Sequence, residues 1–365
     1  MMPAEKIRVL IVDDSVVVRL MLSDLIRRDA ALECVGAAVN GRAALDCLDT
    51  LRPDVVIMDV EMPVMGGVEA VAAIRVRNPR LPVIMFSTHT EEGAMVTIEA
   101  LARGAADYVT KPTNAANSEA AIQSIREQLL PKIKALGRPS HKLPPPTLPS
   151  PAPSLPASLA PPPPLPFSVS RSKIDLVCIA ASTGGPNALE TLLMPFPANF
   201  PVPIVIVQHM PPAFTRHLAQ RLASRCAIRV REAESGEALE PGVALIAPGG
   251  FHLVVKKRGT GGFVSTNQDA EENSCRPSAD VLFRSVSAMF GQHTLAVVLT
   301  GMGQDGLHGC AAIRAAGGKV LVQDEATSVV WGMPGSVARA GLADMILPIE
   351  HLAADVMRAV QGGRT

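Results

Sequence analysis

The feature that most constrains the fold is a proline-rich segment near the middle of the chain. Thirteen of the 32 prolines lie between Pro139 and Pro166, among leucine, serine and alanine. Proline lacks a backbone N–H and fixes φ, so this stretch excludes a helix or a central strand. We therefore expect a mobile spacer, residues 137–170, between a first domain, residues 1–130, and a second, residues 172–365. Its P-x-x-P spacing also matches polyproline-reading modules, but composition alone generates such matches.

Charge and composition favour catalysis or protein contact over nucleic-acid binding. Basic and acidic residues number 34 each, and Trp331 and Tyr108 are the only Trp and Tyr, so no basic groove with stacking aromatics is expected. We find no signal peptide and no apolar run of about 20 residues, and we expect a cytoplasmic monomer that is not membrane-embedded. Six scattered cysteines without C-x-x-C spacing indicate reduced thiols, not disulfides or zinc ligands.

The first domain alternates apolar runs with helical stretches and predicts a doubly wound α/β sheet of five strands and five helices. The expected strands are Ile7 to Val12, Leu32 to Ala38, Val55 to Met58, Pro82 to Phe86 and Asp107 to Val109. In such folds ligands bind at the carboxyl ends of the strands.

Five polar side chains follow these strands: Asp13 and Asp14 the first, Asp59 the third, Ser87 the fourth and Lys111 the fifth. Crowded carboxylates repel one another unless a divalent cation lies between them, and oxygen ligands suit Mg²⁺. Each acid alone could cap the helix that follows its strand. Capping does not easily explain all five positions.

These residues lie in the motifs IVDDS, MDVEMPVMGG, FST and DYVTKP, and with them the first domain resembles the receiver domain of response regulators. The resemblance implies a flavodoxin-like fold, a histidine kinase as phosphodonor and Asp59 as phospho-acceptor. It implies Mg²⁺ held by Asp13, Asp14, Asp59 and the backbone carbonyl of Glu61. It further implies Ser87 and Tyr108 as switch residues and Lys111 as the phosphate partner.

Three apolar runs in the second domain predict buried parallel strands: Ile174 to Ala180, Val202 to Val207 and Leu295 to Thr300. The helices expected between them are Asn187 to Met194, Phe214 to Arg225 and Ala279 to Met289, long enough for right-handed crossovers. Ser182 follows the first strand, His209 the second and Asp305 the third. Parallel strands bring these three ends to one edge of the sheet.

Ser182 lies at a turn into a helix, because Gly184 and Gly185 supply turn freedom and Pro186 suits a first helical position. The helix points free N–H groups at the turn and favours an anionic intermediate there. The alternative is an N-capping serine on a phosphate-binding or structural turn, since the usual esterase elbow is G-x-S-x-G and position 180 is alanine.

A serine becomes a nucleophile when an imidazole takes its proton and a carboxylate orients that imidazole. Ser182, His209 and Asp305 can fill these roles. His308 is a rival base because it follows Asp305 closely, although the strand-end position favours His209. His209 and Asp305 also have ordinary structural explanations. His209 could simply be a polar residue where the chain leaves the core, and Asp305 could be a helix N-cap.

The motifs STGGP, QHMP, APGG followed by His252, RPSAD, TGMGQDG and VWGMPG resemble the catalytic domain of chemotaxis protein-glutamate methylesterases. The resemblance implies a Rossmann-like domain, the triad Ser182, His209 and Asp305, and an oxyanion region at Thr183 and Met302. Ala180 departs from the glycine usual in the family, which is expected to tighten the elbow. For Trp331 and the turn Met333 to Gly335 we derive no chemical role, and core packing or helix entry would explain them.

Together the two resemblances imply a phosphorylation-regulated esterase of bacterial chemotaxis adaptation. It hydrolyses glutamate methyl esters on chemoreceptors to glutamate and methanol and also deamidates receptor glutamines, with no cofactor for the esterase. One alternative is a receiver-controlled serine esterase that acts on a different protein or acyl substrate. Another is a non-catalytic phospho-switched adaptor, against which the intact triad argues.

Overall fold

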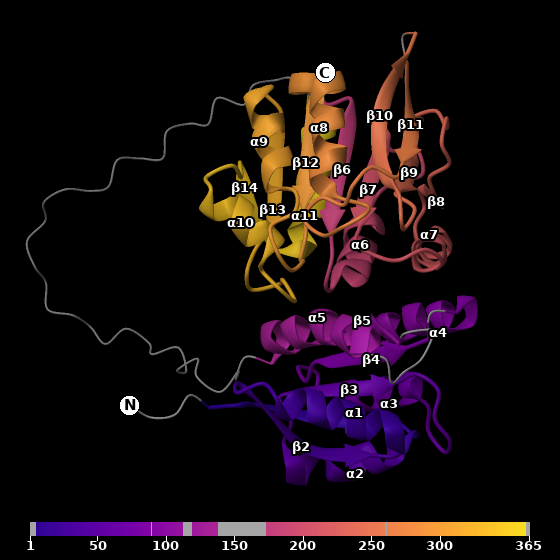
Figure 1. The fold of residues 1–365 in the computed structure, drawn as a ribbon. Coiled ribbons are helices and arrows are strands. Elements are labelled where there is room, and N and C mark those ends of the chain that lie inside the picture. The colour runs from indigo at the N-terminus through magenta and orange to yellow at the C-terminus, as the bar shows by residue number, and fades with distance from the viewer. Residues whose placement is uncertain (1–4, 89, 112–118, 138–172, 260, 363–365) are drawn as a thin grey trace, which may run out of the picture.

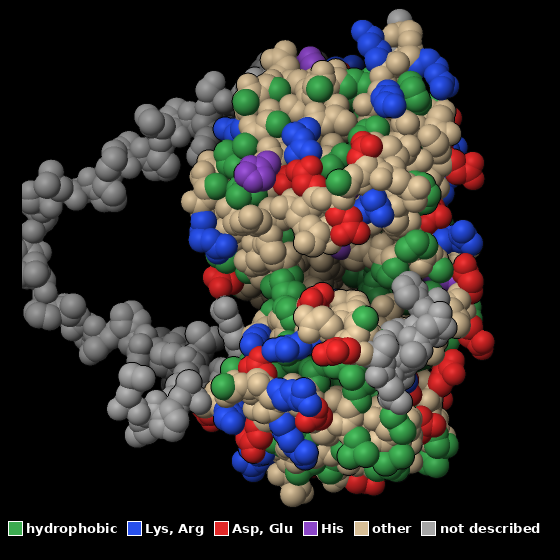
Figure 2. All heavy atoms as spheres, viewed as in Figure 1, with side chains coloured by type: hydrophobic (Ala, Val, Ile, Leu, Met, Phe, Trp, Pro, Cys, Tyr) green, Lys and Arg blue, Asp and Glu red, His purple; other side chains and the backbone are tan. Residues whose placement is uncertain are grey.

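Two α/β domains stack against each other in the computed structural model (Figure 1). The structure describes residues 5–88, 90–111, 119–137, 173–259 and 261–362. The predicted spacer therefore lies, from residue 138 onward, outside the described residues. Charged side chains of both signs are scattered over the face in Figure 2 and do not gather into one patch. No helix among the described residues is long and apolar enough to cross a membrane.

The first domain is a five-stranded parallel sheet in the order β2-β1-β3-β4-β5. All five predicted strands are present, with ends within one residue of those expected. The strands are β1 (Ile7–Val12), β2 (Leu32–Ala38), β3 (Val55–Asp59), β4 (Val83–Ser87) and β5 (Asp107–Thr110). The helices are α1 (Val16–Arg27), α2 (Gly41–Leu51), α3 (Gly67–Arg77), α4 (Glu91–Ala102) and α5 (Glu119–Leu136).

Helices cover both faces of this sheet, because alternate side chains of each strand point to opposite sides. One core lies under α1 and α5 and includes Val9, Ile11 and Leu129. The other lies under α2, α3 and α4 and includes Leu10 and Val12. Both faces of β1 are thus buried, as its mainly apolar sequence, interrupted only by Arg8, predicts.

The second domain is built on seven parallel strands in the order β14-β13-β12-β6-β7-β9-β8. These strands are β6 (Leu176–Ala181), β7 (Ile204–Gln208), β8 (Arg229–Glu232), β9 (Val243–Ile246), β12 (Thr294–Val298), β13 (Lys319–Gln323) and β14 (Met345–Leu347). The three predicted strands are the three central ones, β12, β6 and β7. Sequence reasoning missed the other four; β8, β9 and β14 have only three or four residues each, whereas β13 is as long as β7 and β12.

Two layers of helices sandwich this sheet. The helices are α6 (Gly185–Leu193), α7 (Phe214–Arg225), α8 (Ala279–Phe290), α9 (Leu307–Ala315), α10 (Met333–Arg339) and α11 (Ile349–Gln361). The core on one face draws on α6, α7 and α11, and the core on the other face draws on α8, α9 and α10. An antiparallel hairpin, β10 (His252–Arg258) and β11 (Gly261–Asn267), projects beside the sheet (Figure 1).

Strand order places the predicted reactive residues at the middle of the sheet. The chain leaves β6 toward β7 on one side, and β12 pairs with β6 on the other. Such a reversal of strand order opens a crevice at the carboxyl ends, where ligands bind in open α/β sheets.

Candidate functional site

The turn after β6 carries Ser182 and depends on two glycines. Gly184 has φ +78°, and a Cβ there would lie 2.6 Å from the Cβ of Val329. A Cβ on Gly185 would lie 2.0 Å from Oε1 of Gln208. No larger residue fits either position without displacing its neighbours. The turn therefore leads directly into α6 with Ser182 partly exposed at its start.

Buried polar residues from neighbouring strand ends hold this turn. The backbone N–H of Ser182 donates to the carbonyl of Thr300 at 3.0 Å, and Nε2 of Gln208 donates to the carbonyl of Ser182 at 3.0 Å. The hydroxyl of Thr300 donates to the carbonyl of Thr183 at 2.9 Å. Sequence reasoning assigned no role to Gln208 or Thr300. Their position at the ends of β7 and β12 was the available signal.

His209 and Asp305 meet at this edge, with Nε2 of His209 and Oδ2 of Asp305 2.7 Å apart. His209 lies beside the serine turn, because its backbone N–H donates to the carbonyl of Ala181 at 3.2 Å. The other ring nitrogen, Nδ1, lies 3.6 Å from Sγ of Cys275. In the described part of the chain the hydroxyl of Ser182 makes no hydrogen bond.

The imidazole and carboxylate strongly shift each other's titration. Burial alone lowers the pKa of His209, but its hydrogen bonds to Asp305 and Cys275 raise that pKa to about 10. Burial likewise opposes ionisation of Asp305, yet His209 and the donors around the carboxylate hold its pKa well below the usual range. Because a raised pKa keeps the imidazole protonated near neutral pH, a reaction that needs neutral His209 accelerates as pH rises.

His308, the rival base, is exposed and makes no hydrogen bond among the described residues. Asp305 is only 2% exposed and does accept N–H groups at a helix start. That helix is α8 and not the helix that follows Asp305 in sequence, because its partners include the backbone N–H of Ala279 at 2.6 Å. The expectation that Asp305 caps the following helix is therefore wrong, since Gly306 is the N-cap of α9, and capping of α8 coexists with the bond to His209.

Two backbone N–H groups beside Ser182 remain available to an oxyanion. Neither the N–H of Thr183 nor that of Met302 has an acceptor within the ranges that the structure describes. Met333, at the start of α10, packs against the loop that carries Met302. A Cβ on Gly301 in that loop would lie 2.4 Å from the sulfur of Met333. Met333 to Gly335 are buried in the first turn of α10, which fits packing and helix entry.

Trp331 is also structural, because its indole N–H donates to the carbonyl of Gln323 at 3.1 Å. Ala180, the departure from the family's glycine, is fully buried in the core on the α8 side. A Cβ added to Gly306 would lie 4.0 Å from its methyl group, which is an ordinary van der Waals distance.

The first domain places Asp13, Asp14 and Asp59 together at the carboxyl ends of β1 and β3. One carboxylate oxygen from each lies within 4.8 Å of the others. Nζ of Lys111 lies 3.0 Å from Asp13 and 2.8 Å from Asp59. Burial raises the pKa of Asp59 to about 6 against the pull of Lys111. Oxygen donors this close fit a Mg²⁺ ion, whose charge would offset theirs.

The other predicted residues of this domain lie around the acidic cluster or at the domain contact. Ser87 is fully buried, and its hydroxyl donates to the carbonyl of Gly93 at 3.1 Å. Glu61 is exposed two residues after the end of β3. Tyr108 lies under the second domain, where its ring stacks on that of Phe214 with 4.7 Å between centroids.

Comparison with known proteins decides the family. Residues 9–123 match the family of response regulator receiver domains, and residues 177–356 match the family of CheB methylesterases. The chain is 49% identical over 361 residues to the protein-glutamate methylesterase/protein-glutamine glutaminase of Trichodesmium erythraeum, which covers 97% of this chain and 99% of that protein. It belongs to the CheB-type protein-glutamate methylesterases.

Further relatives support the same assignment for this methylesterase. The protein-glutamate methylesterase/protein-glutamine glutaminase 2 of Caulobacter vibrioides is 45% identical over 347 residues and covers 94% of this chain and 96% of that protein. The crystal structure of the Thermotoga maritima CheB methylesterase catalytic domain is 41% identical, with a TM-score of 0.50, over 51% of this chain and 98% of that one. The resemblance drawn from the motifs is confirmed.

In this methylesterase the receiver domain directly contacts the serine turn. The hydroxyl of Thr183, next to Ser182, donates to Oδ2 of Asp107 on β5 at 2.6 Å. Asp107 is also paired with Lys132 of α5 at 2.9 Å. Sequence reasoning missed Asp107, because nothing local marks a partner 76 residues away.

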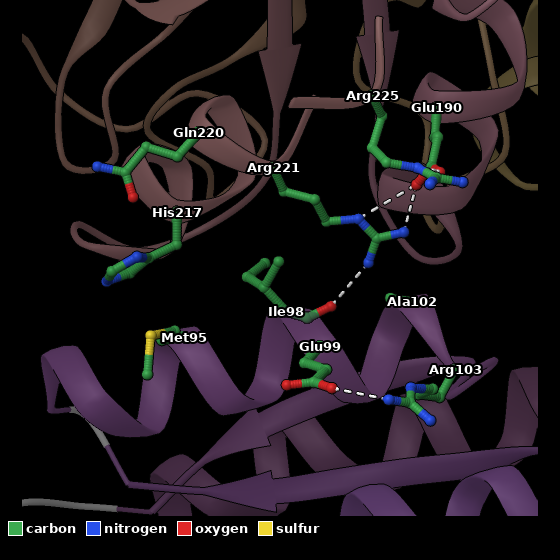
Figure 3. Close-up of a pocket in the computed structure, with 10 residues that line it drawn as sticks. All are labelled: Met95, Ile98, Glu99, Ala102, Arg103, Glu190, His217, Gln220, Arg221 and Arg225. Atoms are coloured by element: carbon green, nitrogen blue, oxygen red, sulfur yellow. Dashed lines mark hydrogen bonds and ion pairs between the residues drawn. The ribbon is translucent and has the colours of Figure 1, made fainter. Parts of the chain in front are cut away.

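A cavity of about 630 Å³ opens beside this contact, between α4 of the receiver and α6 and α7 of the methylesterase domain (Figure 3). Arg221 crosses the gap, because it donates to the carbonyl of Ile98 at 3.0 Å and also pairs with Glu190. Glu99 and Arg103 pair with each other on the receiver side. The domains therefore meet through polar bridges around this cavity and through the stacked rings of Tyr108 and Phe214.

We predict that Asp305→Asn lowers the pKa of His209 from about 10, because burial is then opposed by Cys275 alone. An NMR pH titration of the histidine rings measures it, with His209→Gln to assign the resonance. Glu91→Gln is the matched control, since Glu91 lies 3.0 Å from another histidine, His217. An unchanged titration of His209 in Asp305→Asn would contradict the pairing.

Proposed function

We propose that this enzyme removes methyl groups from glutamate side chains of bacterial chemoreceptors, giving free carboxylate and methanol, and deamidates receptor glutamines. Methylesterase and glutaminase activity is named for its relatives. The observation that carries the chemistry here is the 2.7 Å bond from His209 to Asp305 beside the turn of Ser182. The domains we assign are residues 1–130 and 172–365, joined by residues 137–170 as a spacer.

In the proposed reaction Ser182 attacks the γ-carbonyl carbon of the methyl ester. His209 takes the serine proton on Nδ1, because Nε2 is engaged by Asp305. The oxyanion binds the N–H groups of Thr183 and Met302. The protonated imidazole then gives its proton to the departing methoxide, and methanol leaves an acyl-enzyme.

Water completes the cycle by attacking the acyl carbon while His209 again acts as base. The products are the glutamate carboxylate and free Ser182. Glutamine deamidation needs the same steps, with ammonia as the protonated leaving group. A methyl ester and a primary amide differ little in size, which suits one site to both.

The receiver domain carries the proposed regulatory input. Asp59 is the proposed phospho-acceptor, and a chemotaxis histidine kinase is the proposed donor. Asp13, Asp14, Asp59 and the backbone carbonyl of Glu61 would hold Mg²⁺, which offsets negative charge on the phosphoryl group. Lys111 would pair with the product phosphate and so leave its present contacts, while Ser87 and Tyr108 adjust.

The domain contact supports restraint of the esterase in the resting chain. Asp107 holds the residue next to the nucleophile, and Tyr108, beside it on β5, stacks on Phe214 of α7. A hydrogen bond to a charged group, such as that from Thr183 to Asp107, contributes about 1.5–3 kcal/mol, so a small rearrangement at Asp59 can shift such a contact.

Ser182→Ala should lower the rate of methanol release from methylated receptor membranes by about three orders of magnitude or more. Without the nucleophile, only substrate binding and the oxyanion site still contribute to the rate. His209→Ala should cost nearly as much, and the double variant no more than either single. His308→Ala is the histidine control. A larger loss in His308→Ala than in His209→Ala would reassign the base. Normal release by Ser182→Ala would overturn the proposed chemistry.

Asp59 should take up phosphate from a histidine kinase or a small phosphodonor only with Mg²⁺ present, because three carboxylates repel the donor without it. Asp59→Asn should abolish labelling with radioactive donor. Asp46→Asn, which changes an exposed carboxylate on α2, is the control. Labelling that survives Asp59→Asn or a chelator would move the phosphosite elsewhere.

A fragment beginning near Ser170 should release methanol faster than the unphosphorylated whole chain, and phosphorylation should raise the whole chain to at least the fragment's rate. Asp107→Ala should also raise the resting rate, because it frees the hydroxyl of Thr183. Glu99→Ala is the control, since Glu99 pairs within the receiver. A fragment no faster than the resting chain would exclude simple occlusion and leave positive activation or receptor docking.

A further inference from the structure

The start of α8 is capped in an unusual way. Ser278 is its N-cap residue, but the Ser278 side chain makes no capping bond to its own helix. Asp305 takes over that role, because it accepts the N–H of Ala279 at 2.6 Å and that of Asp280 at 3.1 Å. The hydroxyl of Ser278 therefore does not accept a backbone N–H of α8, as an N-cap serine usually does.

That hydroxyl points instead at Asp305. Oγ of Ser278 donates to Oδ1 of Asp305 at 2.8 Å, on the carboxylate whose other oxygen binds His209. Ser278 is fully buried, so water does not readily replace this bond. Asn273 donates to the same oxygen at 2.8 Å but is exposed, which makes its bond the more replaceable one.

His252 contacts the backbone of Ser278. The N–H of Ser278 lies 3.3 Å from Nδ1 of His252, and Nε2 of His252 lies 3.0 Å from the carbonyl of Ala270. In these contacts Nδ1 of His252 accepts from Ser278 and Nε2 donates to Ala270. His252 is only 1% exposed and contacts no reacting group. A bonded chain therefore runs from His252 through Ser278 to Asp305 and His209.

We propose that Ser278 is a positioning residue for the catalytic pair, held in place by His252. It fixes the rotation of the Asp305 carboxylate and shares its negative charge, which limits how strongly the carboxylate holds the proton of His209. This role rests on the proposed function only in taking His209 as the base.

The Ser278→Ala substitution should raise the pKa of His209. With one donor removed, the charge on Asp305 is less dispersed, so the imidazolium is stabilised more strongly. The pKa of His209 should rise by roughly one unit, which is a tenfold change in the ratio of charged to neutral ring. The acid limb of the pH–rate profile should move upward by the same amount, with KM unchanged.

The experiment uses the full chain and two readouts, the NMR titration of His209 and the pH profile of methanol release from methylated receptor membranes. Ser278→Thr keeps the hydroxyl and should restore both. Ser287→Ala is the matched control, since it removes another buried hydroxyl bond of α8, to the carbonyl of Ala312 at 3.0 Å, away from Asp305. If Ser278→Ala does not fold, Ser278→Cys takes its place as a weaker donor.

Shifts in Ser278→Ala that are absent in Ser278→Thr and Ser287→Ala support the positioning role. An unmoved titration and pH profile in Ser278→Ala, or equal shifts in Ser287→Ala, overturn it. The NMR readout needs no turnover, so it still decides the role of Ser278 if the wild-type chain releases no methanol. A wild-type chain that releases no methanol would instead show that methylated receptors are not its substrate.

Discussion

The reactive edge of this enzyme depends on one buried carboxylate. Asp305 accepts five hydrogen bonds, from His209, Asn273, Ser278 and the N–H groups of Ala279 and Asp280. A buried carboxylate without such partners would take up a proton and lose its charge. The charge that orients His209 is therefore maintained by the start of α8. The proposed catalytic pairing and the capping of α8 thus depend on the same carboxylate.

The capping is reciprocal and ties two helices together. Asp305 precedes α9 and caps α8, while Asp280 in the first turn of α8 accepts the N–H of Gly309 in α9 at 2.6 Å. The helices approach closely, because a Cβ on Gly309 would lie 2.5 Å from that of Phe283. Close packing of α8 on α9 holds Asp305 in place relative to His209, which directly follows β7.

Strand ends were predictable from sequence, and the contacts between them were not. An apolar run followed by a polar residue marks the end of a buried strand, which located Ser182, His209 and Asp305 and the acidic cluster of the receiver. Edge strands such as β8 and β14 are short and partly exposed, so they lack that signal. Cys275 beside His209 and Asp107 beside Thr183 depend on pairings 66 and 76 residues apart, which no local pattern encodes.

The strand β5 connects the two functions of the chain. Lys111, directly after it, holds Asp59 and Asp13, while Tyr108 and Asp107 on the strand itself contact Phe214 and Thr183. A backbone hydrogen bond from Lys111 to Ser87 at 2.6 Å joins the end of β5 to that of β4. Under the proposed function, a shift of Lys111 toward a phosphoryl group would act on the strand that contacts the serine turn. The path from the acidic cluster to that turn runs through one short segment, from Asp107 to Lys111.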